Sequence, residues 1–229
     1  LPETLAAARR TPLRPGRLLR AHWHLLRAPR FLLLAASSAL LFNGFFAYVL
    51  SAPAFLLKHL NLTPEQFYWL SFPAVAGIMG GSLLANRLSG RASHGLTIGA
   101  GFAVMLLAAT LNVATSTQGS RALAVLPVAI YAFGMALATP SLTLLALDLF
   151  PGQRGIASGT LGLVQMSANS LSAALLAPVL SESARGLALG MVGFAAAALA
   201  AYVLAVWAGK PGSRRGPTSG PSGRGDGPV

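Results

Sequence analysis

Six stretches of this sequence carry no charged side chain and are long enough to cross a membrane. They cover residues 31–57, 66–86, 96–120, 122–147, 155–181 and 186–209. A helix needs about 20 residues to cross roughly 30 Å of hydrocarbon. Strands of a membrane barrel are about 10 residues long and alternate in polarity, and these Ala-, Leu- and Gly-rich stretches do not alternate. The sequence therefore predicts an all-α membrane protein with six transmembrane helices.

Residues at the edges of these stretches set the expected bounds of each segment. We expect spans at about 31–54, 66–88, 96–115, 123–148, 155–180 and 186–208. Residues 1–30 are basic and rich in proline, which predicts a cytoplasmic connector lying on membrane lipids, with Trp23, Leu25 and Leu26 in a short interfacial helix. Residues 209–229 lack large apolar side chains before Val229, which predicts a disordered cytoplasmic tail.

The formal net charge of +12 is distributed unevenly between the two sides of the predicted membrane domain. With the connector in the cytoplasm, the basic residues on that side are Arg9, Arg10, Arg14, Arg17, Arg20, Arg27, Arg30, Arg87, Arg91, Arg154, Lys210, Arg214, Arg215 and Arg224. Those on the other side are Lys58, Arg121 and Arg185. Basic residues in short loops stay in the cytoplasm. The bias predicts a multi-pass protein of the inner (plasma) membrane with both termini cytoplasmic, and it makes nucleic acid an unsuitable partner.

The predicted spans contain no histidine or carboxylate near their centres, and the chain has no cysteine. A metal site needs several such ligands together, and acid–base catalysis needs a titratable group in a pocket. The segment GIASG at 155–159 is superficially similar to a serine-protease loop, but no span supplies the histidine that would activate the serine. We therefore expect no enzyme activity, no metal and no cofactor.

Uncharged polar residues form a stripe along the fifth predicted span. Gln165 and Asn169 are four residues apart, so they share one helix face. Steps of three and four extend that face to Ser158, Gly162, Gln165, Asn169 and Ser172. Such a stripe either bonds to a neighbouring helix or lines a cavity, since polar groups inside a membrane avoid lipid in both cases. Periodicity alone leaves both interpretations open.

Glycine and proline indicate where the helices pack closely or bend. Glycines four residues apart let helices approach closely, and such pairs occur at Gly77 and Gly81, Gly155 and Gly159, and Gly186 and Gly190. Pro140 interrupts the fourth predicted span. It removes one helical hydrogen bond, so we expect a kink there unless Thr139, Ser141 or Thr143 bonds to the backbone.

Three segments of the chain stand out together: LPETL at 1–5, FFAYVLSAPAFLLKHLNLTPEQF at 45–67 and LDLFPGQRGIASGTLGLVQ at 147–165. In this order they resemble the second half of a drug-exporting transporter of the major facilitator superfamily, most closely its Bcr/CflA-type multidrug efflux branch. The turn GSLLANRLSGR at 81–91 resembles a degenerate copy of the superfamily's loop signature, with Asn86 in place of an acid. That replacement argues against a gating salt bridge at this turn.

The resemblance implies that the chain corresponds to the seventh to twelfth spans of a twelve-span transporter. Such a half is built as an inverted 3+3 repeat and meets an amino-terminal six-span half around a midplane solute site. The implied function is efflux of amphipathic, drug-like small molecules by proton antiport. The alternatives are a non-transporting subunit or pseudo-transporter, and a chain that pairs with itself.

The resemblance and the polar residues of the spans together give the candidate site residues. We expect the substrate wall to contain Asn43, Phe46, Tyr48, Tyr131, Gln165 and Asn169, with Gly44 allowing close packing. The candidate gating or loop residues are Asn86, Arg87, Arg91, Asp148 and Arg154. Because no span carries an acid near its centre, the resemblance implies that the protons would bind in the other half.

Overall fold

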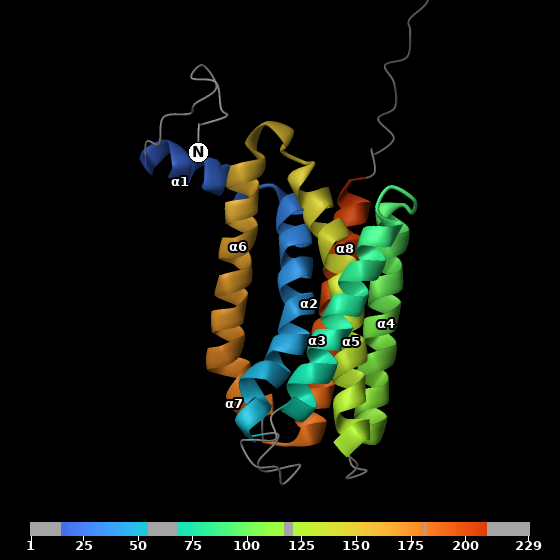
Figure 1. The fold of residues 1–229 in the computed structure, drawn as a ribbon. Helices are drawn as coiled ribbons and strands as arrows, with labels where there is room; N and C mark the ends of the chain where they lie inside the picture. The colour runs from blue at the N-terminus through green and yellow to red at the C-terminus, as the bar shows by residue number, and fades with distance from the viewer. Residues whose placement is uncertain (1–14, 55–67, 117–120, 181, 210–229) are drawn as a thin grey trace, which may run out of the picture.

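A computed structural model describes residues 15–54, 68–116, 121–180 and 182–209, and all of the regular structure in these ranges is helical (Figure 1). The α-helices are α1 (Pro15–Leu26), α2 (Pro29–Ala54), α3 (Tyr68–Leu88), α4 (His94–Thr115), α5 (Arg121–Leu147), α6 (Arg154–Leu171), α7 (Ala177–Leu180) and α8 (Ala184–Ala208). A 3-10 turn, Pro151–Gln153, precedes α6, and a π-helix, Ser172–Leu176, joins α6 to α7. The predicted tail at 210–229 and residues 1–14 of the connector lie outside the described residues.

Four of the helices are long and apolar enough to cross a membrane. The qualifying segments are Pro29–Ser51, His94–Thr115, Leu123–Leu147 and Ala184–Ala208. These four agree with four of the six predicted spans, and the all-helical fold class is confirmed over the described residues. The chain is therefore a membrane-embedded protein.

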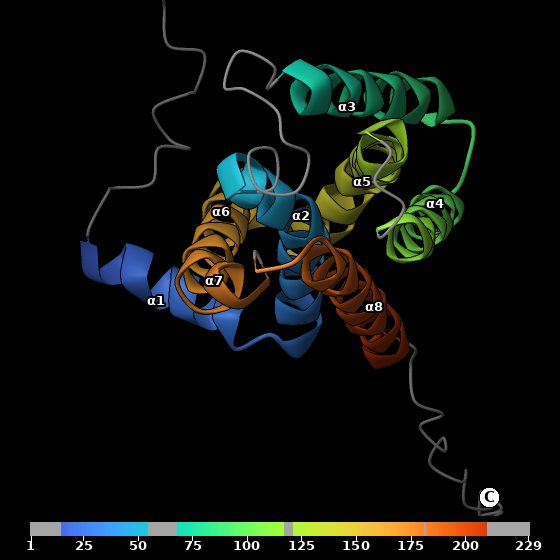
Figure 2. The ribbon, with the colours of Figure 1, turned by 90° about the horizontal axis from the view of Figure 1, so that it is seen from below.

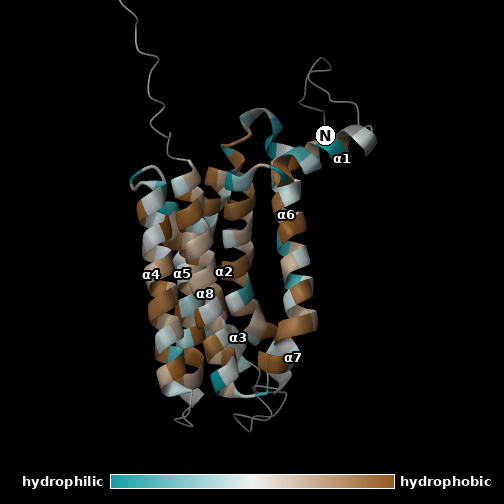
Figure 3. Ribbon diagram, turned by 180° about the vertical axis from the view of Figure 1, so that it is seen from behind, coloured by the Kyte–Doolittle hydropathy of each residue, from teal (hydrophilic) through white to brown (hydrophobic). Residues whose placement is uncertain are grey.

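The other two predicted spans correspond to α3 and to the interrupted segment α6–α7, which are not among these four. The polar residues of α6 lower its mean hydropathy, and polar patches recur along this helix in Figure 3. Both run beside the four apolar helices in Figure 1, and their crossing of the membrane stays a prediction.

The bundle is organised around α2 and α5, which contact each other (Figure 2). Helices α3 and α4 both pack against α5, while α6 and α8 both pack against α2. Helices α4 and α8 also touch, and they lie on the same side of the bundle in the end-on view. The buried core, which includes Phe102, Met105, Val128 and Met191, fills the space between these helices.

Close helix contacts occur where glycine replaces a side chain. A Cβ built on Gly77 or Gly81 would lie 2.2 Å from a backbone oxygen of α5, which confirms the packing predicted for this pair. Gly101 of α4 and Gly134 of α5 form a similar contact that the sequence analysis did not single out. The prediction was wrong at Gly155, because nothing lies within 4 Å of its Cβ position on the exposed side of α6, whereas Ala157 of the same turn is buried.

Helix α5 continues through Pro140 to Leu147 without interruption. The Thr139 hydroxyl donates to the carbonyl oxygen of Met135 over 2.7 Å. The carbonyl that Pro140 leaves without a helical donor is that of Ala136, four residues earlier, so this bond does not replace the missing one. Compensation by Thr139, Ser141 or Thr143 stays a prediction.

One end of the bundle, which we call the basic end, carries Arg27, Arg30, Arg87, Arg91 and Arg154. The amphipathic helix α1 lies across this end, outside the bundle and beside α6 (Figures 1 and 2). Here the Arg30 guanidinium packs against Gly209 at the end of α8, where a Cβ would lie 2.5 Å from its Cζ. A cation is favourable at this position because the carboxyl end of a helix carries partial negative charge.

Candidate functional site

Two asparagines, Asn43 of α2 and Asn169 of α6, meet inside the bundle, and we call them the amide pair. Asn43 Nδ2 donates to the carbonyl oxygen of Ala39 over 2.8 Å and to Asn169 Oδ1 over 3.1 Å. Both side chains are buried. The Ala39 carbonyl fixes which way the Asn43 amide points, because only the NH2 group can donate to it. The polar stripe of α6 therefore makes an interhelical hydrogen bond at Asn169.

The other atom of the Asn43 amide, Oδ1, is buried and has no hydrogen-bond partner among the described residues. Leaving a buried acceptor without a partner costs about 1–3 kcal/mol. Asn169 lies in the last turn of α6, where the backbone N–H of Ser172 bonds to the carbonyl oxygens of Ala168 and Asn169. The π-helix begins at Ser172, and π-helical segments are frequent at functional sites.

Gln165 and Phe46, the predicted neighbours of the amide pair, are both partly buried. Gln165 lies one helical turn before Asn169, and Phe46 stacks on Phe42 with ring centroids 5.8 Å apart. Ser158 and Gly162, which belong to the same stripe, lie nearer the start of α6, and both are exposed. The stripe thus runs from an exposed region near the basic end to a buried one at Asn169.

The two tyrosines predicted for the substrate wall are fully buried between helices. The Tyr131 hydroxyl donates to the carbonyl oxygen of Leu41 over 3.0 Å, which ties α5 to α2. The Tyr48 hydroxyl accepts a hydrogen bond from Asn112 Nδ2, which ties α2 to α4. Asn112 was missed in the sequence analysis, although an asparagine within an otherwise apolar span is itself a signal because it avoids lipid.

An apolar cavity of about 280 Å³ lies between α2, α3 and α5. Its lining includes Phe45, Tyr48, Ser71, Val75 and Ile78. Tyr48 therefore contacts this cavity with part of its ring while its hydroxyl bonds to Asn112. The cavity offers an apolar and aromatic surface on the same helix as Asn43.

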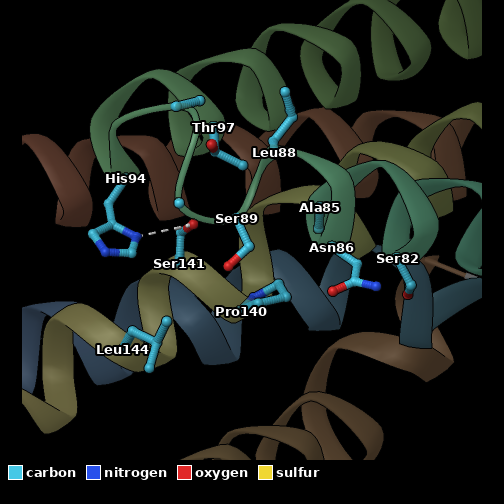
Figure 4. Close-up of a pocket in the computed structure, with 12 residues that line it drawn as sticks. Ser82, Ala85, Asn86, Leu88, Ser89, His94, Thr97, Pro140, Ser141 and Leu144 are labelled. Carbon is cyan, nitrogen blue, oxygen red and sulfur yellow. Dashed lines mark hydrogen bonds between the residues drawn. The ribbon is translucent and has the colours of Figure 1, made fainter.

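A second cavity, of about 220 Å³, lies at the basic end between α3, α4 and α5 (Figure 4). Asn86 lines it together with Ser82, Ser89, His94, Thr97 and Ser141. His94 Nδ1 and Ser141 Oγ are 3.4 Å apart, and Ser93 caps α4 by accepting from the Leu96 amide. Asn86 thus lies beside hydroxyl and imidazole side chains in this cavity, and the absence of a gating salt bridge at this turn stays a prediction.

The remaining predicted loop residues are exposed at the basic end. Arg91 Nη1 lies 3.5 Å from the Arg87 carbonyl oxygen, across a turn in which Gly90 has a φ of 75°. Arg154 and Asp148 form an ion pair of 2.7 Å, with side chains 60% and 49% exposed. Exposed pairs of this kind contribute only about 0–1 kcal/mol. The structure brings these residues to one end of the bundle but not into one cluster with the amide pair.

The described residues contain no group of three His, Asp or Glu side chains able to hold a metal ion. The side chains that the structure does bring together inside the spans are amides, hydroxyls and aromatic rings. In the structure these groups bond to one another and to backbone carbonyl oxygens across the helices.

A comparison with curated proteins finds no match. The family model of the Major Facilitator Superfamily matches residues 2–173, which extend from the connector into the π-helix. The chain therefore belongs to the major facilitator superfamily, whose members are membrane transporters rather than enzymes.

Proposed function

We propose that this chain is the carboxy-terminal half of an exporter that moves amphipathic, drug-like small molecules across the membrane by proton antiport. The amide pair carries the proposal. Asn43 Oδ1 is a buried acceptor without a partner among the described residues, and it lies where α2 meets α6. A solute or water that donates a hydrogen bond there would remove the cost of leaving that acceptor unpaired.

The exposed face of α6 supports a second six-span half as the partner. Ser158, Ser167 and Ser170 are exposed on this helix, beside the apolar Leu163 and Met166. Ser158 and Ser167 are nine residues apart, so the polar side chains are spread over the exposed part of α6 rather than aligned on one line. Exposed polar side chains are unfavourable against lipid, so we infer that other helices cover this part of α6 and close a polar pathway. The apolar side chains between them suit contact with an amphipathic solute.

Helix pairing supports an inverted 3+3 repeat of α2–α4 and α5–α8. Helix α2 of the first repeat packs against α6 and α8 of the second. Helix α5 of the second repeat packs against α3 and α4 of the first. Exchanging α2 with α5, α3 with α6 and α4 with α8 leaves this set of contacts unchanged. Repeats of this kind place solute sites at their interface near the midplane. Because α3 and α6 correspond to each other in this repeat, we infer that both α3 and α6–α7 cross the membrane.

The basic end supports the proposed orientation, with both termini on the cytoplasmic face of the inner membrane. Arginines at short turns remain on the cytoplasmic side. The Bcr/CflA branch is proposed from the three sequence segments alone. Because the spans carry no carboxylate or histidine near their centres, the coupling protons would bind in the amino-terminal half.

The test is efflux of a fluorescent amphipathic dye from cells that express the chain with a matching six-span first half. We expect efflux that stops when an uncoupler removes the proton gradient. Asn43→Ala and Asn169→Ala should each lower efflux about tenfold, as expected for a loss of about 1.4 kcal/mol of transition-state interaction. Thr110→Ala is the matched control, because Thr110 is an exposed polar residue of α4 that bonds only to its own helix.

Other outcomes distinguish the alternatives. Efflux from the chain alone would indicate that two copies pair to form the transporter. No efflux in either case would favour a non-transporting subunit. Full efflux by Asn43→Ala would show that the amide pair is not part of the solute pathway.

A further inference from the structure

Helix α1 is held against the bundle along one side only. Leu25 is fully buried, and His22 Nδ1 lies 2.7 Å from Thr160 Oγ1 of α6. His24 packs edge-on against Phe150, with ring centroids 6.0 Å apart. These contacts fix α1 to the turn between α5 and α6 and to the first turns of α6.

The side of α1 away from these contacts carries large apolar residues. Leu19 is 72% exposed and Trp23 is 55% exposed. They are four residues apart, so they lie one turn apart on the same face. Exposed leucine and tryptophan on one face of a surface helix are typical of a helix that lies in the membrane interface.

The charge of this segment is of one sign. Between Pro15 and Arg30 the sequence has four arginines, Arg17, Arg20, Arg27 and Arg30, and no acidic residue. The Arg27 guanidinium lies 4.9 Å from the centroid of the Trp23 ring, which places a cation beside the apolar face. Arg20 is exposed one residue after Leu19. A protein surface or water would not explain both features, whereas an anionic phospholipid supplies acyl chains and phosphate at adjacent depths.

The position of α1 agrees with this partner. It runs across the basic end and out beyond α6, where no other described helix covers it (Figures 1 and 2). The apolar segment of α2 begins at Pro29, directly after α1, so α1 lies at the membrane boundary. The geometry points to α1 as a membrane-surface helix that binds anionic phospholipid headgroups through its arginines, inserts Leu19 and Trp23 among the acyl chains, and thereby anchors the end of α6.

The test uses Trp23 as a reporter in the full chain. Besides Trp23 the sequence has Trp69 and Trp207, so a Trp69→Phe/Trp207→Phe background leaves one tryptophan. This protein is placed in nanodiscs of zwitterionic lipid, with or without phosphatidylglycerol, and brominated acyl chains serve as quenchers. We expect blue-shifted and strongly quenched Trp23 emission in the anionic discs and a clear loss of quenching in the zwitterionic ones.

Charge variants then separate a specific contact from general attraction. Arg20→Gln should reduce quenching in anionic discs, while Arg91→Gln, which removes an exposed arginine from the α3–α4 turn, should not. Emission from Trp23 that stays at the wavelength of water-exposed indole and resists quenching in anionic discs would overturn the proposal. Equal quenching in both kinds of disc would overturn the role of the anionic headgroup. Neither result depends on transport.

Discussion

Gly44 of α2 and Tyr131 of α5 occupy complementary space where the two central helices meet. A Cβ added at Gly44 would lie 2.2 Å from the Tyr131 hydroxyl oxygen and 2.8 Å from Cζ of that ring. The same hydroxyl donates to the Leu41 carbonyl oxygen one turn earlier on α2. The absence of a side chain at Gly44 thus lets a tyrosine from another helix reach the α2 backbone.

The first prediction is that Gly44→Ala destabilises the protein, because the tyrosine must move away from α2 and lose its hydrogen bond. Overpacking of this kind costs about 1–3 kcal/mol. The measurement is the melting temperature of the purified protein in nanodiscs. Tyr131→Phe serves as a second variant, and we expect the double variant to lose less than the sum of the two single losses. Additive losses would show that the two residues do not interact.

The second prediction compares a buried glycine, Gly81 of α3, with an exposed one, Gly99 of α4. Gly81→Val should disrupt the contact of α3 with α5, since a Cβ there would lie 2.2 Å from the Phe133 carbonyl oxygen. Gly99→Val in α4 is the matched control, because nothing lies within 4 Å of its Cβ position. We expect loss of monodisperse protein for the first and little change for the second, measured by size-exclusion chromatography. Equal behaviour would contradict the α3–α5 packing.

The third prediction concerns the hydrogen bond between Tyr48 and Asn112. Hydrogen bonds between membrane helices contribute about 0.6 kcal/mol on average. Both partners here are buried, so Tyr48→Phe leaves a buried amide without this partner, and we expect a loss at the upper end, about 1–2 kcal/mol. A double-variant cycle with Asn112→Leu gives the coupling free energy. A coupling near zero would mean that the bond does not stabilise the fold.

The sequence was sufficient to identify an all-helical membrane protein because long apolar stretches have few other solutions. It could not place Tyr131 and Tyr48, since their partners lie 90 and 64 residues away along the chain. Their aromatic and hydroxyl chemistry suits a solute wall and helix packing equally well. In the structure their hydroxyls bond within the bundle.

The site on α6 shows what periodicity can and cannot supply. The spacing of Gln165 and Asn169 predicted a shared face, and the structure shows Asn169 bonded across to Asn43. No periodic pattern identifies the helix that such a face meets. The π-helix at Ser172–Leu176 was also missed, because this segment has neither glycine nor proline to mark an irregular backbone.

The fourth prediction is that the ion pair of Asp148 and Arg154 contributes little to stability. Both side chains are about half exposed, so water and salt screen their attraction. Asp148→Asn should therefore lower the free energy of unfolding by less than about 1 kcal/mol. The same variant measured at high salt should differ even less from the parent protein. A large loss of stability would indicate that the turn between α5 and α6 depends on this pair.

The fifth prediction separates function from stability at the amide pair. Asn43→Ala leaves Asn169 Oδ1 without its donor and opens a small cavity, so we expect a loss of stability. Replacing both partners by apolar groups of similar size can be nearly neutral or stabilising, and it would also remove the unpaired Asn43 Oδ1. The double variant Asn43→Leu/Asn169→Leu should therefore melt at or above the temperature of the parent protein while efflux with the partner half is lost. If the double variant unfolds more readily than Asn43→Ala, the amide pair is needed for the fold, and the unpaired Asn43 Oδ1 gives no argument for solute binding.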